Sequence, residues 1–265
     1  MLDLGLKLWS HNKEYALLAP GLYEKKVFDY IELYIVPQTF EKFSKIWKGL
    51  GIPFLIHSTH SMHGFNLAEK TKLKANLKMF SEVRAFADEL NASIIIIHPG
   101  IEGTLEESMR QILKLNDKRL AVENKPFVSM NGEKCRGSSF EEISQILSFC
   151  KTNFCLDIPH AINAALHLRI DCYTYIKKLL EFDPGIIHIA DGRMSKIHDE
   201  HLNIGNGEYD FGKISEILGS VKARYLTLET QKRKEDLSDF SADIEKIRAL
   251  LVSDRQPRLA GGADM

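Results

Sequence analysis

The chain has 265 residues, a length that suits either one large α/β barrel or two smaller domains. Its formal net charge of −1 argues against strong non-specific attraction to nucleic acid, although a local basic groove is still compatible with that charge. No apolar run approaches the roughly 18 residues of a membrane span, and the N-terminus lacks a signal-peptide pattern, so we expect a cytoplasmic protein without a membrane partner.

Short apolar runs alternate with longer amphipathic runs along the chain, which is the pattern of strands and helices that follow one another. Eight runs have the composition of β-strands: residues 4–9, 28–36, 53–57, 93–98, 119–123, 153–157, 185–189 and 225–229. Apolar spacing of three and four predicts helices over residues 40–50, 67–90, 138–150, 173–180, 211–218 and 237–251.

Strand–helix alternation without a change in composition favours a single (β/α)₈ TIM barrel over residues 1–254. The alternative is an open doubly wound sheet. It is disfavoured because no glycine-rich fingerprint follows the first predicted strand, where Ser10 and His11 stand instead. The small and polar tail, residues 255–265, is expected to be disordered.

Metal-capable side chains end six consecutive predicted strands, from the third to the eighth. These residues are His57, His98, Glu123, Asp157, His188 and Glu229. Any one of them alone could be a structural histidine or a helix cap. In a barrel, however, the carboxyl ends of the strands meet at one mouth, where three carboxylates would raise one another's pKa values. Metal ions would hold the carboxylates ionised and the histidines neutral, so the pattern predicts a metal centre.

Three more candidates follow the sixth and seventh strands, namely His160, Asp199 and His201. The complete set contains five histidines, two aspartates and two glutamates. A mixed nitrogen and oxygen set suits Zn²⁺ best, with Mn²⁺ or Fe²⁺ as alternatives. Because nine ligands exceed what one four-coordinate site can use, we expect two or three ions.

Five short motifs resemble those of endonuclease IV, the zinc-dependent apurinic/apyrimidinic endonuclease of the xylose isomerase-like TIM-barrel superfamily. They are VEN at 122–124, CLDIPHA at 155–161, IHIAD at 187–191, DEHLNIGNG at 199–207 and LTLET at 226–230. The resemblance runs in the same order from about Ile56 to Glu229. It implies a trinuclear centre whose first ion is held by His57, His98 and Glu123, whose second is held by Glu123, Asp157, His188 and Glu229, and whose third is held by His160, Asp199 and His201.

The chemistry implied by this resemblance is in-line hydrolysis of a phosphodiester at abasic sites during DNA repair, with metal-activated hydroxide as the attacking group. Glu123 and Glu229 would be the catalytic carboxylates. Glu123 would fix the pair of ions, and Glu229 would also orient the hydroxide.

The predicted rim departs from this family, whose loops insert an arginine and a tyrosine into DNA. Residues 34–40 contain no arginine or lysine, and His60 stands at the position of the tyrosine. We expect His60, Lys125 and Arg193 to contact the substrate, which is either abasic DNA or a small sugar or phosphorylated molecule. Further basic candidates are Lys134, Arg136 and Lys196.

Two other hypotheses stay open. A sugar or sugar-phosphate isomerase or epimerase of the same superfamily would use one or two ions, with Glu123 and Glu229 as its acid and base. A barrel that only binds a partner is the third hypothesis, but a cluster of buried carboxylates without ions would be costly to maintain. The sequence leaves the oligomeric state open.

Overall fold

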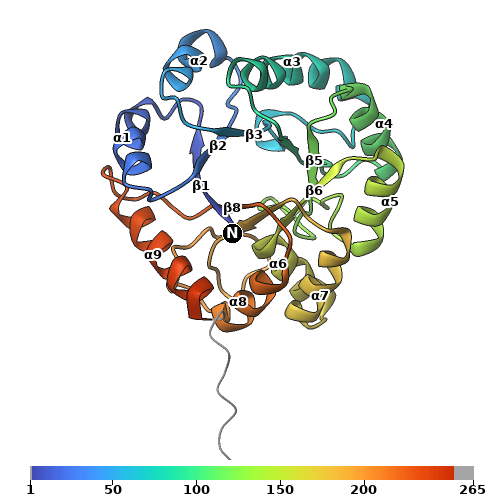
Figure 1. Ribbon diagram of the computed structural model, residues 1–265. Coiled ribbons are helices and arrows are strands. Elements are labelled where there is room, and N and C mark those ends of the chain that lie inside the picture. Colours follow the sequence, from blue (N-terminus) through green and yellow to red (C-terminus); the bar gives the residue numbers. More distant parts are fainter. Residues whose placement is uncertain (1, 254–265) are drawn as a thin grey trace, which may run out of the picture.

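Eight parallel strands form a closed barrel, in the order in which they follow one another along the chain (Figure 1). The computed structural model describes residues 2–253. The strands are β1 Asp3–Trp9, β2 Tyr30–Tyr34, β3 Phe54–His57, β4 Ile95–Ile97, β5 Leu120–Glu123, β6 Asn153–Asp157, β7 Ile186–Ile189 and β8 Tyr225–Leu228. Because β1 pairs with both β2 and β8, the sheet has no free edge, and the predicted (β/α)₈ barrel is confirmed.

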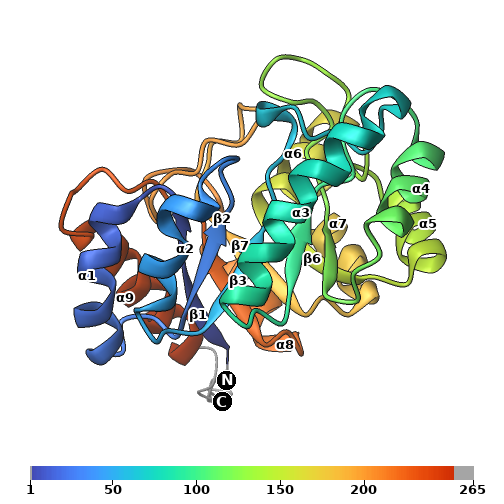
Figure 2. The same ribbon diagram turned by 90° about the horizontal axis from the view of Figure 1, so that it is seen from above.

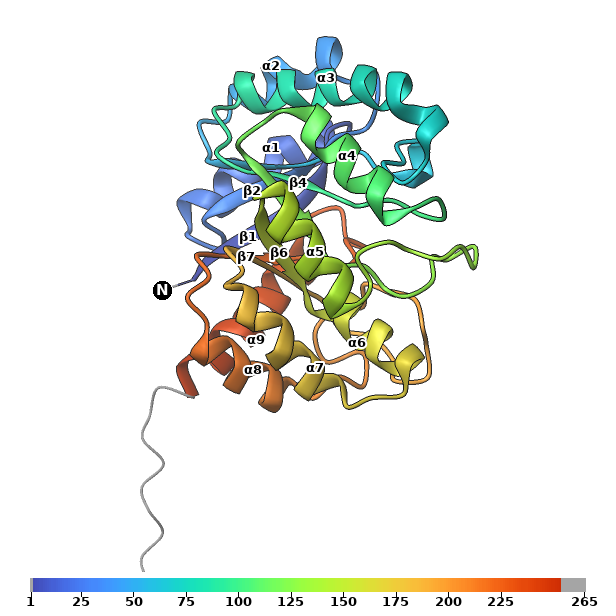
Figure 3. The same ribbon diagram turned by 90° about the vertical axis from the view of Figure 1, so that its right-hand side faces the viewer.

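Helices cover the outside of the barrel (Figures 1 and 3). They are α1 Lys13–Glu24, α2 Phe40–Lys48, α3 Leu73–Glu89, α4 Leu105–Leu115, α5 Phe140–Cys150, α6 Ile158–Leu168, α7 Cys172–Leu179, α8 Phe211–Ser220 and α9 Ser238–Ser253, with 3₁₀ turns η1 Ser61–His63, η2 Lys70–Lys72 and η3 Leu180–Phe182. None of these helices in residues 2–253 is long and apolar enough to cross a membrane.

The helix predictions needed three additions and one correction. Helices α1, α4 and α6 were not predicted. Helix α1 contains Pro20 and exposes Leu17, so its apolar stripe is irregular, whereas the first two turns of α6 are buried all round and carry no amphipathic signal. The predicted helix 67–90 begins only at Leu73, because Asn66 is tied into a loop by hydrogen bonds with Asn76. The predicted tail, 255–265, lies outside the described residues.

The interior of the barrel has an apolar floor. Every second residue of a strand points inward. The lower inward positions are occupied by Tyr30, Leu55, Ile96, Ala121, Cys155 and Ile186, which form a cluster separate from the main core between strands and helices. Gly5 leaves room for the Tyr30 ring, since a Cβ there would lie 2.4 Å from that ring. The Tyr30 hydroxyl lies 2.7 Å from Oγ1 of Thr227 on β8 and closes the floor.

Polar side chains occupy the next inward layer, two residues further along each strand. This layer contains Lys7, Glu32, His57, His98, Glu123, Asp157, His188 and Thr227. The strand register brings several of them to one level, because Lys7 pairs with Glu32 and Asp157 pairs with His188. The barrel therefore carries a ring of ionisable groups just below its carboxyl end. The carboxyl ends of the strands lie on the side of the barrel away from the N-terminus (Figure 2).

Candidate metal centre

Glu123, at the end of β5, lies at the middle of the metal-capable side chains. Its Oε1 lies 3.2 Å from Nε2 of His98 and 3.0 Å from Nδ1 of His160. Its Oε2 lies 3.0 Å from Nε2 of His57 and 3.5 Å from Nδ1 of His188. Each carboxylate oxygen thus faces two histidines, and His57 and His98, which the resemblance assigns to one ion, face different oxygens of Glu123.

The electrostatics of this cluster favour the protonation state of a metal ligand at Glu123 and His98 but not at His188 or Asp157. Against the effect of burial, neighbouring charges raise the pKa of His188 well above its ordinary value, and burial raises the pKa of Asp157. Burial by itself would raise the pKa of Glu123, but the charges of His98 and Lys125 and the hydrogen bonds from His160 and His57 hold that pKa well below its ordinary value. Burial lowers the pKa of His98 to about 3. An ionised carboxylate beside a neutral imidazole is the combination that binds a metal ion.

Two of the ligand sets implied by the resemblance come together in the structure. The ligating atoms of His57, His98 and Glu123 all lie within 4.8 Å of one another, and so do those of Asp157, His188 and Glu229. In the second set, His188 Nδ1 lies 2.9 Å from Glu229 Oε1 and 3.7 Å from Asp157 Oδ2. Each set is compact enough to surround one ion, and Glu123 lies between them.

The third set converges more loosely, on one oxygen of Asp199. His160 comes from the first turn of α6, where the Asp157 side chain caps the helix by accepting a hydrogen bond from the His160 backbone N–H. Asp199 Oδ2 lies 3.6 Å from Nε2 of His160 and 3.2 Å from Nε2 of His201. Among residues 2–253, His160 also groups with Glu123 and Asp157, whereas Asp199 and His201 join no such compact group.

Three buried atoms of the candidate ligands lack a hydrogen-bond partner within the described part of the chain. They are His188 Nδ1, Asp199 Oδ2 and His201 Nδ1. Leaving such an atom unsatisfied costs about 1–3 kcal/mol, so a ligand is the expected partner. His188 Nδ1 lies close to Glu229 Oε1, but the geometry between the two atoms is not that of a hydrogen bond. Two atoms that bind the same metal ion have this kind of arrangement. The donor atoms and their spacing fit Zn²⁺ and are compatible with Mn²⁺ or Fe²⁺.

Asp191, two residues beyond the end of β7 at Ile189, anchors the loop that carries Asp199 and His201. Its buried carboxylate accepts backbone N–H hydrogen bonds from Gly192, Gly205, Gly207 and Tyr209. Asp191 also forms an antiparallel bridge with Leu202. Glycine is required at 207, because a Cβ there would lie 2.3 Å from Asp191 Oδ1. The beginning and the end of the loop between β7 and α8 are therefore folded around one carboxylate.

Sequence reasoning missed two charged residues of the inward ring, Lys7 on β1 and Glu32 on β2. The Lys7 ammonium donates hydrogen bonds to the carboxylates of both Glu32 and Glu229. Glu32 Oε2 lies 2.9 Å from Nε2 of His188. Both residues precede the end of their strand by two positions, so a search of strand ends overlooks them. The usable signal was a charged residue at an inward position of an otherwise apolar strand.

The three predicted substrate contacts lie in different surroundings. The His60 ring stacks on His98, with ring centroids 5.0 Å apart, so it lines the mouth. Lys125 turns inward, with Nζ 3.3 Å from both His98 Nε2 and Glu123 Oε1 and 3.2 Å from His160 Nε2. Arg193 lies on the rim, where its guanidinium is 3.1 Å from Glu200 Oε1 and its side chain is half exposed.

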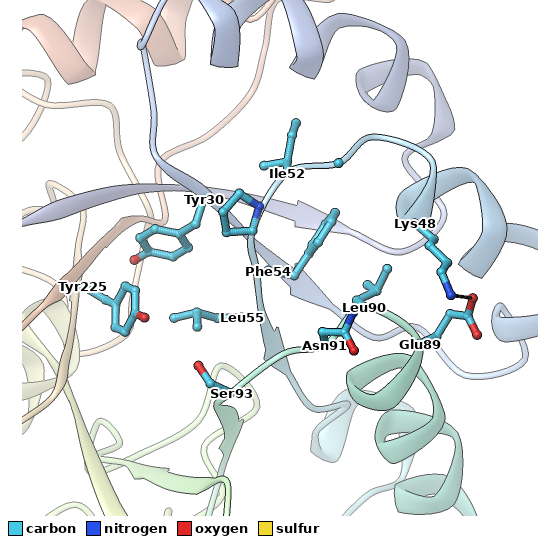
Figure 4. Close-up of a pocket in the computed structure, with 12 residues that line it drawn as sticks. Tyr30, Lys48, Ile52, Phe54, Leu55, Glu89, Leu90, Asn91, Ser93 and Tyr225 are labelled. Carbon is cyan, nitrogen blue, oxygen red and sulfur yellow. Dashed lines mark ion pairs between the residues drawn. The ribbon is translucent and has the colours of Figure 1, made fainter.

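A pocket of about 420 Å³ opens at the opposite end of the barrel, where strands β2, β3 and β8 begin (Figure 4). Tyr30, Leu55 and Tyr225 line it, and an ion pair between Lys48 and Glu89 borders it. Glu89 is its one metal-capable side chain among the described lining residues and is paired with lysine, so the chemistry lies at the carboxyl end instead.

Comparison with known proteins finds one family. A family model described as xylose isomerase-like TIM barrel matches residues 19–250. A curated relative, "Probable endonuclease 4" of Latilactobacillus sakei subsp. sakei (strain 23K), is 25% identical over 183 residues. That match covers 62% of this chain and 60% of the relative, so it spans about three fifths of the relative's length.

Two solved structures share the fold over nearly their whole length. A D-tagatose 3-epimerase-like protein superposes with a TM-score of 0.68 at 16% identity, covering 96% of this chain and 100% of the other. Endonuclease IV from Thermus thermophilus superposes with a TM-score of 0.66 at 21% identity, covering 95% of this chain and 99% of the other. At such low identity the superpositions establish the barrel and leave the reaction to be argued from the site.

Proposed function

The chain belongs to the xylose isomerase-like TIM barrel family, and we propose that it is a metal-dependent phosphodiester hydrolase that cleaves DNA at abasic sites. The observation that carries this proposal is the gathering of all nine expected ligands at one barrel mouth, with Asp199 and His201 beside His160. The similarity to the curated "Probable endonuclease 4" supports the same reaction class.

Each part of the centre has a role in this proposal. The compact sets around Glu123 and around His188 would each hold one ion, and the Asp199 set would hold a third. Bound zinc would supply charge stabilisation for the phosphate and would lower the pKa of a bound water. Glu123 is buried between the two compact sets and keeps their ligands at a constant spacing.

Glu229 is the strand-end carboxylate best placed to meet the attacking water. Its side chain is 13% exposed, against 2% for Glu123 and 1% for Asp157. Its Oε2 faces the rim, 3.8 Å from Nδ1 of His201. A carboxylate at this position can accept a proton from water and orient it toward a phosphate that enters through the mouth.

The test is incision of a duplex oligonucleotide that contains one tetrahydrofuran abasic analogue, using zinc-loaded protein at micromolar concentration. We expect cleavage at the analogue, none in the undamaged duplex, and loss of cleavage after chelation. Zinc-loaded protein that leaves the abasic duplex intact would contradict the proposal.

A second candidate function, isomerisation or epimerisation of a sugar or sugar phosphate, is favoured by the state of the basic residues at the mouth. Lys125 points inward, Arg193 is paired with Glu200, and Arg136 donates hydrogen bonds to the carbonyl groups of Glu102 and Gly103. These cations are therefore engaged within the protein, a condition that suits a small substrate better than a DNA backbone. The structural likeness to a D-tagatose 3-epimerase-like protein supports this alternative.

Metal stoichiometry separates the two functions. About three ions per chain, counted on protein purified without chelators, would favour the hydrolase, and about one would favour the isomerase. An isomerase would also exchange a carbon-bound proton of a ketose with solvent deuterium, with Glu123 and Glu229 as its acid and base. Deuterium uptake without DNA incision would select the second function.

A further inference from the structure

The His188 imidazole is held on both sides, and only one side faces the candidate metal ligands. Its Nδ1 lies near Glu229, Asp157 and Glu123 and has no hydrogen-bond partner in the described residues. Its Nε2 lies 2.9 Å from Oε2 of Glu32. An imidazole protonated on Nε2 donates to Glu32 and leaves the lone pair of Nδ1 free for an ion.

Glu32 is fully buried, and both of its oxygens are satisfied. Oε2 accepts a hydrogen bond from the Thr227 hydroxyl at 2.6 Å and faces His188, while Oε1 accepts a hydrogen bond from Lys7. A buried carboxylate without a cation is strongly unfavourable, so the ion pair with Lys7 helps Glu32 to stay ionised inside the barrel.

Lys7 connects this carboxylate to the ligand set. The same ammonium group donates a hydrogen bond to Glu229, which lies 2.9 Å from His188 Nδ1 on the other side of the ring. A closed ring of contacts therefore links one residue each from β1, β2 and β7 with the residue that follows β8, namely Lys7, Glu32, His188 and Glu229. Lys7 and Glu32 thus contact two candidate ligands, and the Glu32 carboxylate itself lies within 4.8 Å of ligating atoms of His57 and Glu229.

We propose that Glu32 and Lys7 are positioning residues of the metal centre. Glu32 holds His188 in the tautomer that presents an unprotonated Nδ1 to the ion, and Lys7 holds Glu32 and Glu229 at a constant separation. This inference rests on the metal centre of the proposed function and is independent of which substrate the centre acts on. A carboxylate that orients a ligating histidine raises metal affinity in other proteins.

Glu32→Gln is the informative variant because it keeps the shape of the side chain and changes the hydrogen-bond direction. Lys7 needs an acceptor, so the glutamine oxygen turns toward Lys7 and its NH₂ group faces His188 Nε2. The histidine must then carry its proton on Nδ1, which blocks the ion. We expect zinc affinity, measured by competition with a chromophoric chelator, to fall by about 10- to 100-fold.

The tautomer is measured by ¹⁵N NMR of the histidine rings in chelated protein, at a pH high enough for His188 to carry a single proton, because neighbouring charges outweigh burial and raise its pKa well above the ordinary value. We expect a proton on His188 Nε2 in the wild type and on Nδ1 in Glu32→Gln. The matched control is Glu89→Gln, which removes a carboxylate paired with two lysines, Lys45 and Lys48, on the outer face of the barrel. This control should leave both zinc affinity and the His188 tautomer unchanged.

A double variant, Glu32→Gln with Lys7→Met, separates positioning from a loss of folding. Without Lys7, the glutamine oxygen is free to face His188 Nε2, so the wild-type tautomer and most of the zinc affinity should return. If Glu32→Gln does not fold, the tautomer and affinity of the double variant carry the test, and a proton on Nδ1 there would overturn the inference.

The inference fails if Glu32→Gln binds zinc within about twofold of the wild type and keeps the proton on Nε2. It also fails if chelated wild-type protein carries the proton on Nδ1. Failure of the proposed function looks different, since wild-type protein would then show the expected tautomer and zinc affinity but would not incise abasic DNA.

Discussion

The candidate metal ligands lie in two regions that are built differently, the barrel interior and the loop between β7 and α8. The ligands His57, Glu123, Asp157 and His188 lie on strands, and each side chain is at most 4% exposed. Asp199 and His201 lie on the loop, and the His201 side chain is 40% exposed. The interior ligands form compact groups, and the loop ligands meet only at one oxygen of Asp199.

This difference has a physical origin. Hydrogen bonds between neighbouring strands set the height of each interior ligand, and the two-residue alternation sets its direction, so many interactions determine each position. The loop lacks such a ladder of strand hydrogen bonds and is held instead by scattered contacts, among them backbone N–H groups donating to the buried carboxylates of Asp191 and Asp243. Interior ions are therefore expected to bind more tightly than the ion held by the loop.

The largest effect is expected from Glu123→Gln, which removes the carboxylate between the two interior sets. Loss of several kcal/mol of charge stabilisation corresponds to a fall in kcat/KM of about a thousandfold or more, together with loss of interior ions. Metal analysis and steady-state kinetics measure both quantities. Glu141→Gln, on the exposed face of α5, is the control, and unchanged metal content in Glu123→Gln would refute the assignment.

Asp191→Asn tests the loop without touching a ligand. The amide cannot accept all the backbone hydrogen bonds that the carboxylate accepts, so we expect about 3 kcal/mol of lost stability and weaker binding of one ion. Urea denaturation and metal counting are the measurements. The interior ions should stay bound, and loss of every ion at once would remove the distinction between the two regions.

A matched control for Asp191→Asn is Asp210→Asn, which affects only the N-cap of α8, where the Asp210 side chain accepts the Lys213 backbone N–H. The expected cost of this change is below about 0.5 kcal/mol, because asparagine caps a helix about as well as aspartate, with no change in the number of bound ions.

Lys125→Met tests the cation that lies inside the interior group. Its ammonium is 3.3 Å from Glu123 Oε1, so it opposes a divalent ion there. Removing this charge is expected to raise metal affinity by about tenfold, which corresponds to roughly 1.4 kcal/mol of Coulomb repulsion. Lys134→Met, on the same loop, is the control. An unchanged metal affinity with a raised KM would instead identify Lys125 as a substrate contact.

The smallest effect is expected from Arg193→Ala at the rim. Its partner is Glu200, and such a half-exposed pair contributes about 0–1 kcal/mol, so KM should change by less than about fivefold. Titration of substrate with the variant measures this value. A much larger rise in KM would mean that Arg193 leaves Glu200 and binds substrate.

The sequence indicated most of the architecture and the set of candidate ligands. Alternating apolar runs predicted the barrel, and residues at the ends of strands β3 to β8 indicated the metal centre. Both signals are local, because a strand needs a short apolar run and the geometry of a barrel brings strand ends to one mouth. The position of His160 also follows from a local pattern, since Asp157 caps the helix that begins there.

Tertiary structure alone decided the partners of these residues. Lys7 and Glu32 look like isolated charges in apolar strands, and only the closed barrel brings them to His188 and Glu229. The inward turn of Lys125 and the folding of the loop around Asp191 also depend on contacts between distant segments. Residue type and the two-residue alternation along each strand therefore determined which side chains face the mouth. Closure of the barrel determined which of these side chains contact one another, because the partners are far apart in the sequence and meet only across the barrel interior.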